Sequence, residues 1–265
     1  DLMELVGKQI ISPLEYSSLV EARAFLWRVR FGLHIITGRD ENRLLFSHQQ
    51  SLAKHMNYHD KDQLAVEQFM KDYYIRASTV NTVNETLMKY FEEEIWEHSK
   101  NKKIIKLDSN FNLVNNLIEL SSASAFQDSP GALFEMFLWA AKDSRVKGFS
   151  SSTIRAAQKH IHLINDDFRV DPKNNATFLK ILGAPNHLFT QLRRMGRWGI
   201  LGAYLPEFQR VIGHMQFDLF HSYTVDAHTL QVVRNMRRFR YKNSEQKFPI
   251  AAHIHSRLPR IELLY

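Results

Sequence analysis

Residues 61–96 read KDQLAVEQFMKDYYIRASTVNTVNETLMKYFEEEIW, a stretch without a single proline or glycine. Its apolar residues recur every three or four positions, which is typical of a helix that buries one face. These residues are Leu64, Phe69, Tyr73, Ile75, Val80, Val83, Leu87 and Phe91. The stretch predicts one long helix, or two helices with a short break between them, and makes helix the main element of the fold.

Two further helices are expected before this stretch. Residues 18–36 repeat the same spacing, and Gly38 is a plausible end because glycine is common just past helix C-termini. The apolar set in this helix is Leu19, Ala22, Phe25, Leu26, Val29, Leu33 and Ile36. Residues 41–56 also carry apolar residues in helical register, which predicts the second helix.

Helical patterns return after residue 128. Ser129-Pro130 and Asp171-Pro172 each place a good capping residue before a proline, which the first helical turn tolerates. Ser150 is expected to cap a helix that runs to about residue 164, and Pro185 is expected to begin another. Shorter or later elements are an apolar turn at 198–202, a short helix from Pro206 to Gly213, an amphipathic helix over 224–240 and the start of a helix over 259–265.

The stretch between these two helical parts has a different texture. Residues 103–107 and 111–120 are rich in β-forming side chains and flank the turn-prone triplet 108–110. They predict a small hairpin, the only strand region expected. The expected fold class is therefore mostly α, a multi-helix bundle with one small β-hairpin near residues 103–120.

Composition limits the classes of protein to which the chain can belong. With 265 residues, 44% of them hydrophobic, it has enough apolar side chains for one large or two modest domains. It has no cysteine, so disulfides, thiolate metal sites and cysteine nucleophiles are excluded, and a cytoplasmic setting is expected. No apolar run is long enough to cross a bilayer.

The net charge of +7 is spread along the chain, with small clusters around Arg193 and over residues 234–240. Such a distribution is more typical of a solvated basic surface than of a nucleic-acid face. Nucleic acid is accordingly not an expected partner.

Most motifs that carry chemistry are absent or weak. No phosphate-binding glycine loop and no nucleophile elbow occurs. His59-Asp60 and Asp60-Lys61-Asp62 lie in a polar loop, where we expect no fixed metal geometry. The pairs His160/His162 and His253/His255 are interpreted as surface or capping histidines, because zinc sites need three or four ligands. Glu92 to Glu94 is interpreted as a solvated acidic patch late in a helix.

His228 stands apart, because it falls one turn into the helix expected over 224–240. A histidine held on a helix can be rigid, and neutral imidazole is a good ligand for a divalent ion. A buried or capping role is the alternative that the residues alone favour.

Two stretches resemble one known family. The first is FLWRVRF at 25–31 with TGR at 37–39 and RLLFSHQ at 43–49. The second is LGAYLP at 201–206 followed by VIGHMQFDLFHSYTVDAHTL at 211–230, which is long and specific. Together they resemble the bacterial bifunctional uridylyltransferase/uridylyl-removing enzymes of the nitrogen-signalling protein PII.

The resemblance implies a domain arrangement. Residues 1–125 correspond to the helical region that follows the family's nucleotidyltransferase core, residues 126–216 to a helical linker, and residues 217–265 to the beginning of an HD hydrolase domain. The Gly-Ser loop with Asp-x-Asp of the transferase centre would lie before Asp1, and the His-Asp pair of the HD centre beyond Tyr265. The chain is thus expected to hold no complete catalytic centre and to be inactive by itself.

The resemblance also implies residue roles and partners. His228 matches the first metal ligand of the HD centre. Arg30, Arg43, His48 and Gln49 are candidates for the nucleotide side of the transferase cleft, with salt bridging and helix capping as the favoured alternative. The implied substrates are UTP and PII, and the implied cofactor is Mg²⁺ or another divalent ion.

Two alternatives remain open. The chain could instead be a non-enzymatic α-helical module that binds an acidic protein or nucleic acid. The arginines of the 224–240 helix could face an anionic substrate, although a position facing solvent is favoured. They are Arg234, Arg237, Arg238 and Arg240.

Overall fold

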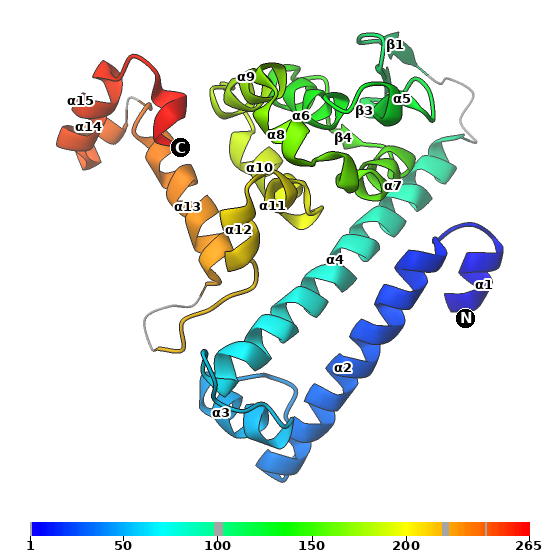
Figure 1. Cartoon of the computed structure of the whole chain (residues 1–265), viewed down its shortest axis with the longest axis vertical. Coiled ribbons are helices and arrows are strands. Elements are labelled where there is room, and N and C mark those ends of the chain that lie inside the picture. The colour runs from blue at the N-terminus through cyan, green and yellow to red at the C-terminus, as the bar shows by residue number, and fades with distance from the viewer. Residues whose placement is uncertain (1, 98–102, 219–222, 242) are drawn as a thin grey trace. The chain divides into compact units, whose positions relative to one another are not determined.

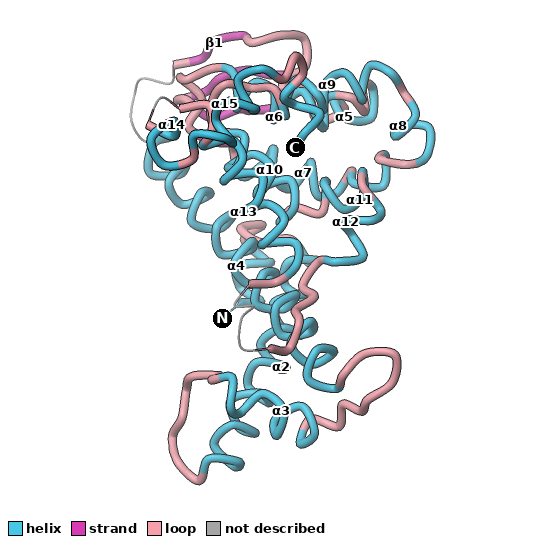
Figure 2. The backbone as a smooth tube through the Cα atoms, turned by 90° about the vertical axis from the view of Figure 1, so that its left-hand side faces the viewer, coloured by secondary structure: helices cyan, strands magenta, loops and turns pink. Residues whose placement is uncertain are grey.

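The computed structural model describes residues 2–97, 103–218, 223–241 and 243–265, and the side chains of Trp96 and Glu97 are outside that description (Figure 1). It confirms the mostly helical fold class, since helix dominates the tube in Figure 2 and the strands form one small patch. The chain divides into two compact units. Unit 1 comprises residues 1–90 and 210–227, and unit 2 comprises residues 91–209 and 228–265.

Unit 1 is built on three helices of very different length. They are α2 (Pro13–Thr37), α3 (Phe46–His55) and α4 (Ala65–Glu97), preceded by the short α1 (Leu2–Gly7). The helix α4 continues past residue 90 into unit 2 and is unbroken, as the lack of proline and glycine predicts. The expected 41–56 helix begins later, at Phe46, because residues 41–45 form a loop around Glu41.

The ends of α2 follow directly from its sequence. Ser12 accepts a hydrogen bond from the backbone N–H of Glu15, and the Glu15 carboxylate accepts one from the Ser12 N–H, which is a capping box. Gly38 ends the helix with φ of 66°, a left-handed conformation that glycine adopts at little cost. The predicted stop at Gly38 is confirmed.

Unit 1 has its own hydrophobic core between these helices. The face of α2 that carries Phe25, Val29 and Leu33 packs with Leu52 of α3 and Phe69 of α4. Gly32 is required there, because a Cβ at this position would lie 2.7 Å from the Leu52 side chain. The remaining buried members are Ala53, Met56, Ala65, Val66, Met70 and Met215.

Unit 2 contains a four-stranded sheet where a single hairpin was expected. The strands β1 (Ile104–Lys106), β2 (Phe111–Val114) and β3 (Leu117–Leu120) pair antiparallel in that order. A second turn interrupts the run 111–120, because Asn115 and Asn116 adopt φ of 49° and 69°, as a two-residue hairpin turn requires. The strand β4 (Gly148–Phe149) then adds parallel to β3, so the expectation of one strand region was wrong.

Unit 2 also contains most of the shorter helices of the chain. They are α5 (Ala125–Asp128), α6 (Ala132–Lys142), α7 (Ser151–Lys159), α8 (Asp166–Val170), α9 (Pro172–Leu182), α10 (Leu188–Arg197), α11 (Ile200–Tyr204), most of α12 (Pro206–Val211), α13 (Val225–Arg238) from residue 228, α14 (Ser244–Lys247) and α15 (Pro249–Arg257). Short 3-10 turns lie at Ile161–Leu163 and Ile261–Leu264.

Several helix starts were predicted correctly and several were not. The side chains of Ser150 and Asp171 cap α7 and α9 as expected. Pro130 and Pro185 instead lie in turns, and their helices begin at Ala132 and Leu188. The apolar turn expected at 198–202 contains the start of α11, and the helix expected over 259–265 is a 3-10 turn.

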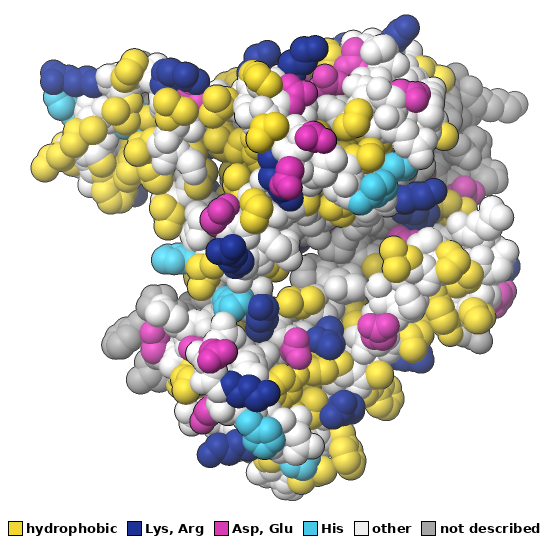
Figure 3. Space-filling view, in the orientation of Figure 1, with side chains coloured by type: hydrophobic (Ala, Val, Ile, Leu, Met, Phe, Trp, Pro, Cys, Tyr) yellow, Lys and Arg dark blue, Asp and Glu magenta, His cyan; other side chains and the backbone are white. Residues whose placement is uncertain are grey.

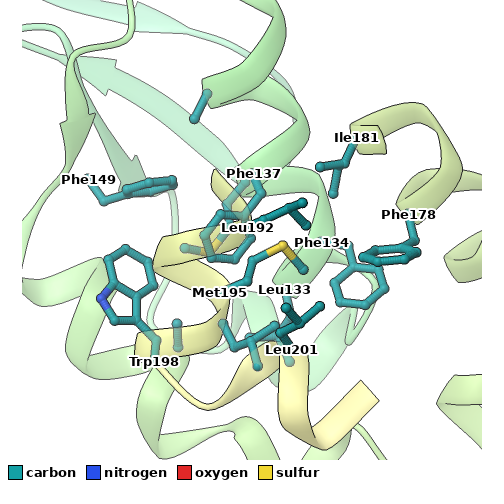
Figure 4. Close-up of a cluster of buried hydrophobic side chains, with 14 of the residues drawn as sticks. Leu133, Phe134, Phe137, Phe149, Phe178, Ile181, Leu192, Met195, Trp198 and Leu201 are labelled. Carbon is teal, nitrogen blue, oxygen red and sulfur yellow. The ribbon is translucent and has the colours of Figure 1, made fainter. Parts of the chain in front are cut away.

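The core of unit 2 is centred on α6, whose Leu133, Phe134, Met136 and Phe137 are fully buried. Figure 4 shows the aromatic side chains gathered around it. The Phe137 ring lies 5.5 Å from that of Trp198, and Phe134 contacts Phe168, Phe178 and Tyr204 edge-on or tilted. Such aromatic contacts stabilise the core beyond what the burial of apolar surface alone contributes.

Candidate functional site

The corner between α2 and α3 is organised by one internal carboxylate. The Glu41 side chain is only 8% exposed, and it accepts hydrogen bonds from the Arg43 backbone N–H and the Arg39 guanidinium, both at 2.9 Å. The backbone N–H of Arg43, and then the charges of Arg39 and Arg43, hold the pKa of Glu41 below its ordinary value. Glu41 therefore remains ionised and fixes the loop.

The same arrangement directs positive charge outward. The side chains of Arg39 and Arg43 are 68% and 78% exposed, so both guanidinium groups reach solvent while their shared carboxylate does not. An exposed cationic corner of this kind can attract an anionic ligand, since a planar guanidinium suits phosphate.

The four candidates for the nucleotide side do not form one connected cluster. Arg30 is exposed on α2, Arg43 lies in the corner, and His48 is half-buried on α3. Gln49 is buried, and its Oε1 has no hydrogen-bond partner among the described residues. No hydrogen bond or ion pair in the described ranges joins any two of the four, so only Arg43 shows the expected salt bridge, to Glu41.

The specific motif includes a loop over residues 213–218, and the chain is described again from residue 223. These two described parts meet in unit 1, because the Gly213 N–H donates to the Asp226 carboxylate at 3.0 Å and the Val225 N–H donates to the His214 carbonyl at 2.7 Å. Further along, the Phe217 N–H donates to Glu67 of α4, and the Phe217 ring stacks on Phe46 of α3 at 4.2 Å. The first part of the loop is thus held against both helices.

His214 emerges as a residue that motif analysis did not single out. Its Nδ1 lies 3.4 Å from Nε2 of Gln63, and its Nε2 is buried without a hydrogen-bond partner in the described part of the chain. Burial and the charge of Lys71 lower the pKa of His214, while Glu67 and Asp226 oppose that shift. The sequence signal that could have pointed to this position is the preceding glycine, Gly213. In the structure Gly213 has φ of 73° and lies close to α4, so its backbone is constrained.

His228 lies in the first turn of α13 and is exposed. Among the described residues, no group of three or more histidine, cysteine or acidic side chains has an arrangement that could hold a metal. The described residues therefore do not form a metal site by themselves, and the ligand role of His228 stays a prediction.

Arg237 of α13 has a structural role. The residue is 7% exposed, and its guanidinium donates to the carbonyls of Leu182, Ala184 and Pro185 at 3.0, 2.6 and 3.1 Å. It caps the end of α9, where the carbonyl groups carry partial negative charge. The solvent-facing position that the sequence favoured was therefore wrong for Arg237, which is buried.

The remaining motif interpretations have mixed outcomes. Asp60 accepts the Ala65 N–H at 2.7 Å and caps α4, as a loop residue would. His160 is buried at the end of α7 with Nδ1 2.8 Å from the Ala156 carbonyl, so it is a capping histidine. The interpretation of Glu92 to Glu94 as a solvated patch was wrong for Glu93, which accepts from Ser151 N and Oγ at 2.7 Å.

Comparisons with known proteins agree with this structure. Residues 1–88 match the family described as GlnD PII-uridylyltransferase, and residues 111–204 match the family described as uridylyltransferase GlnD third domain. A bifunctional uridylyltransferase/uridylyl-removing enzyme of Nitrosococcus oceani is 42% identical over 98% of the chain and 29% of its own length. Those of Pseudomonas aeruginosa and Azotobacter vinelandii are 41% and 39% identical over the whole chain and 30% of theirs. No solved structure matches.

These matches show that the chain is similar, over its whole length, to one segment of the bifunctional uridylyltransferase/uridylyl-removing enzymes, which confirms the resemblance found in the sequence. The chain spans about three tenths of the length of the curated relatives that it matches. No helix among the described residues combines the length and the apolar character that crossing a membrane would need.

Proposed function

We propose that this chain is the helical connecting part, with the opening of the HD domain, of an enzyme that transfers UMP from UTP to PII and removes it by hydrolysis. The observation that carries the proposal is the identity of about 40% over the whole chain to enzymes named for both activities. Mg²⁺ or another divalent ion would serve the parent enzyme, and a cytoplasmic location fits these substrates.

In this proposal the α2–α3 corner faces the nucleotide. Arg43 is the best supported candidate, because Glu41 fixes its backbone and leaves its guanidinium exposed. Arg30, His48 and Gln49 would complete this side of the cleft. Their contribution is to bind and orient the triphosphate, since the chain lacks the Asp-x-Asp motif after a Gly-Ser loop.

His228 would supply one ligand of the HD metal site. His228 is exposed at the start of α13, and the further ligands would come from outside the described residues. A bound divalent ion would supply Lewis acidity for phosphodiester hydrolysis.

The chain by itself is expected to be inactive. Purified chain, UTP and PII are incubated with Mg²⁺ or Mn²⁺, and UMP transfer is followed by the mass of PII; removal is followed from uridylylated PII. No turnover is expected in either direction. Turnover in either assay would overturn the view that the catalytic centres lie elsewhere.

A chimaera tests the assigned residues. The corresponding segment of the Pseudomonas aeruginosa enzyme is replaced by this chain, and both activities are expected to persist. His228→Ala should reduce removal of UMP by about 100-fold or more and spare transfer, because loss of a ligand weakens the metal site. Arg43→Ala should raise KM for UTP and spare removal.

His253→Ala is the matched control, since this histidine is also exposed on a helix. It should leave both rates unchanged. Equal loss of transfer and removal in His228→Ala, or none in either, would contradict the assignment. The competing hypothesis, a non-enzymatic module, predicts an inactive chimaera and, if the partner is nucleic acid, a salt-dependent gel shift by the chain.

A further inference from the structure

The helix α2 has an apolar face that its own unit does not cover. Trp27, Phe31 and Ile35 are 69%, 67% and 51% exposed. They follow one another at four-residue spacing, so they form a stripe along one side of the helix. A surface helix normally places polar residues there.

The opposite side of the same helix is already used. Phe25, Val29 and Leu33 are 8%, 5% and 2% exposed and belong to the core of unit 1. The two faces differ in direction by roughly half a turn, since successive residues advance by about 100°. The exposed stripe is therefore a second apolar surface and not the edge of the first.

The stripe is bordered by arginine. Arg23 and Arg30 lie four and three residues from Trp27, and Arg28 lies three residues from Phe31, so each is a surface neighbour of the stripe. All three are exposed, and none forms an ion pair within the described ranges. No acidic residue occurs between Glu21 and Asp40. Figure 3 shows hydrophobic and basic side chains intermixed over the part of unit 1 that holds α1 and α2.

We propose that this surface, Trp27, Phe31 and Ile35 with their arginine border, binds an amphipathic protein helix whose apolar stripe is flanked by carboxylates. The stripe extends over eight residue steps, from Trp27 to Ile35, or about 12 Å along the helix axis, which suits a second helix packed alongside. Tryptophan and arginine are the side chains most enriched where interfaces derive their energy. Acidic flanks would complement the three unpaired arginines.

Two other occupants fit this surface less well. A second copy of the chain would bring Arg23, Arg28 and Arg30 against their own equivalents, and like charges oppose such pairing. A single-stranded nucleic acid would use the aromatic rings for stacking, but Ile35 offers no ring and three arginines give few phosphate contacts. A carboxylate-bordered helix satisfies both the apolar and the charged parts.

Designed peptides test the proposal without knowledge of a natural partner. One labelled helical peptide carries leucines at i, i+3, i+4 and i+7 with glutamates on both flanks, and a second has lysines in their place. Fluorescence anisotropy is expected to give at least tenfold tighter binding of the glutamate peptide. Phe31→Ser should weaken that binding at least tenfold, and Arg23→Glu with Arg28→Glu should reverse the preference between the peptides.

Val170→Ser is the control, because Val170 is a 72% exposed apolar residue of α8 in unit 2. It should bind like the parent chain, and circular dichroism should show all variants folded, since the mutated side chains contact solvent. Equal affinity for both peptides overturns the proposal. So does a dimer in sedimentation that Phe31→Ser abolishes, or binding of oligonucleotide in preference to the glutamate peptide.

The readout is direct binding to the purified chain, so it is independent of uridylyl transfer or removal. Failure of the proposed function would leave this result unchanged, and failure of peptide binding would leave the enzymatic proposal unchanged.

Discussion

Arg237 carries a buried positive charge that is balanced by carbonyl groups, and no carboxylate in the described part of the chain forms an ion pair with it. Its guanidinium joins α13 to the end of α9 through three carbonyls, and the Tyr265 ring lies 5.5 Å from it. Arg237→Met keeps much of the side-chain volume but leaves these carbonyls without donors. We expect the free energy of unfolding to fall by about 3 kcal/mol, measured by urea denaturation followed by circular dichroism.

The neighbouring Arg238 provides the control for this change. It is exposed on the same helix, so Arg238→Met should alter stability by less than about 0.5 kcal/mol. Equal effects of the two substitutions would show that loss of charge on α13, and not loss of the carbonyl contacts, is responsible.

Two histidines make stability depend on pH near neutrality. Burial lowers the pKa of His214, with Lys71 adding to the shift, and burial with Arg240 and Arg237 lowers that of His255. The unfolded chain therefore binds these protons first as the pH falls. The contribution is fully present above the ordinary value of 6.5 and is lost as the pH falls from there toward the lowered values.

We expect the thermal midpoint to fall between pH 7 and pH 5, and the fall to be smaller in His214→Gln and His255→Gln. Glu67 and Asp226 face His214 and oppose its shift, while Gln63 stays neutral. His162→Gln is the control, since His162 is exposed. A pH profile identical in all variants would contradict the assignment.

At the scale of elements, the start of α7 is held by a residue from another helix. Glu93 of α4 accepts from the N–H and the hydroxyl of Ser151, in addition to the local cap by Ser150. A carboxylate at a helix N-terminus is favoured by both hydrogen bonding and the helix dipole. Glu93→Ala should lower stability by about 1 kcal/mol and increase amide hydrogen exchange in the first turn of α7.

Glu207→Ala removes an exposed carboxylate from the first turn of another helix, α12, and is the matched control. It should leave exchange in α7 unchanged. If Glu93→Ala also leaves it unchanged, the contact does not hold the α7 start in solution.

The helix and strand boundaries show which sequence signals are sufficient to predict where an element begins or ends. Caps made by the residue just before a helix, at Ser150 and Asp171, were predictable because the donor and acceptor are three or fewer residues apart. Pro130 and Pro185 misled the prediction, because proline fits a turn as well as a first helical residue. The hairpin was recognised, but its second turn was missed because Asn115-Asn116 interrupts an otherwise apolar run.

Contacts between distant elements could not be predicted in the same way. Glu93 to Ser151 and Phe217 to Glu67 join residues 58 and 150 positions apart, and no local pattern encodes them. The residues of the candidate site differ in the same way. Arg43 and His228 were found from motifs, whereas Glu41, which fixes the corner, and His214, which lies at the base of the loop, became apparent only in three dimensions.

At the scale of the whole molecule, each unit has a separate hydrophobic core. Phe69 is fully buried in the core of unit 1 and Phe137 in that of unit 2, and the two cores share no residue. Replacing either phenylalanine by alanine removes the same number of atoms and should cost about 3–5 kcal/mol in its own core. Comparing the two substitutions therefore tests whether the two cores are stabilised independently.

We expect Phe69→Ala to increase hydrogen exchange in α2, α3 and the first part of α4, and to leave α6, α9 and α10 protected. Phe137→Ala should have the converse effect, because local opening follows the contacts that each side chain makes. Mass spectrometry of exchanged peptides measures both patterns in the intact chain. If either substitution exposes both sets of helices equally, the continuous helix α4 couples the units into one cooperative structure, and stability changes in one core would then extend to the candidate residues of the other.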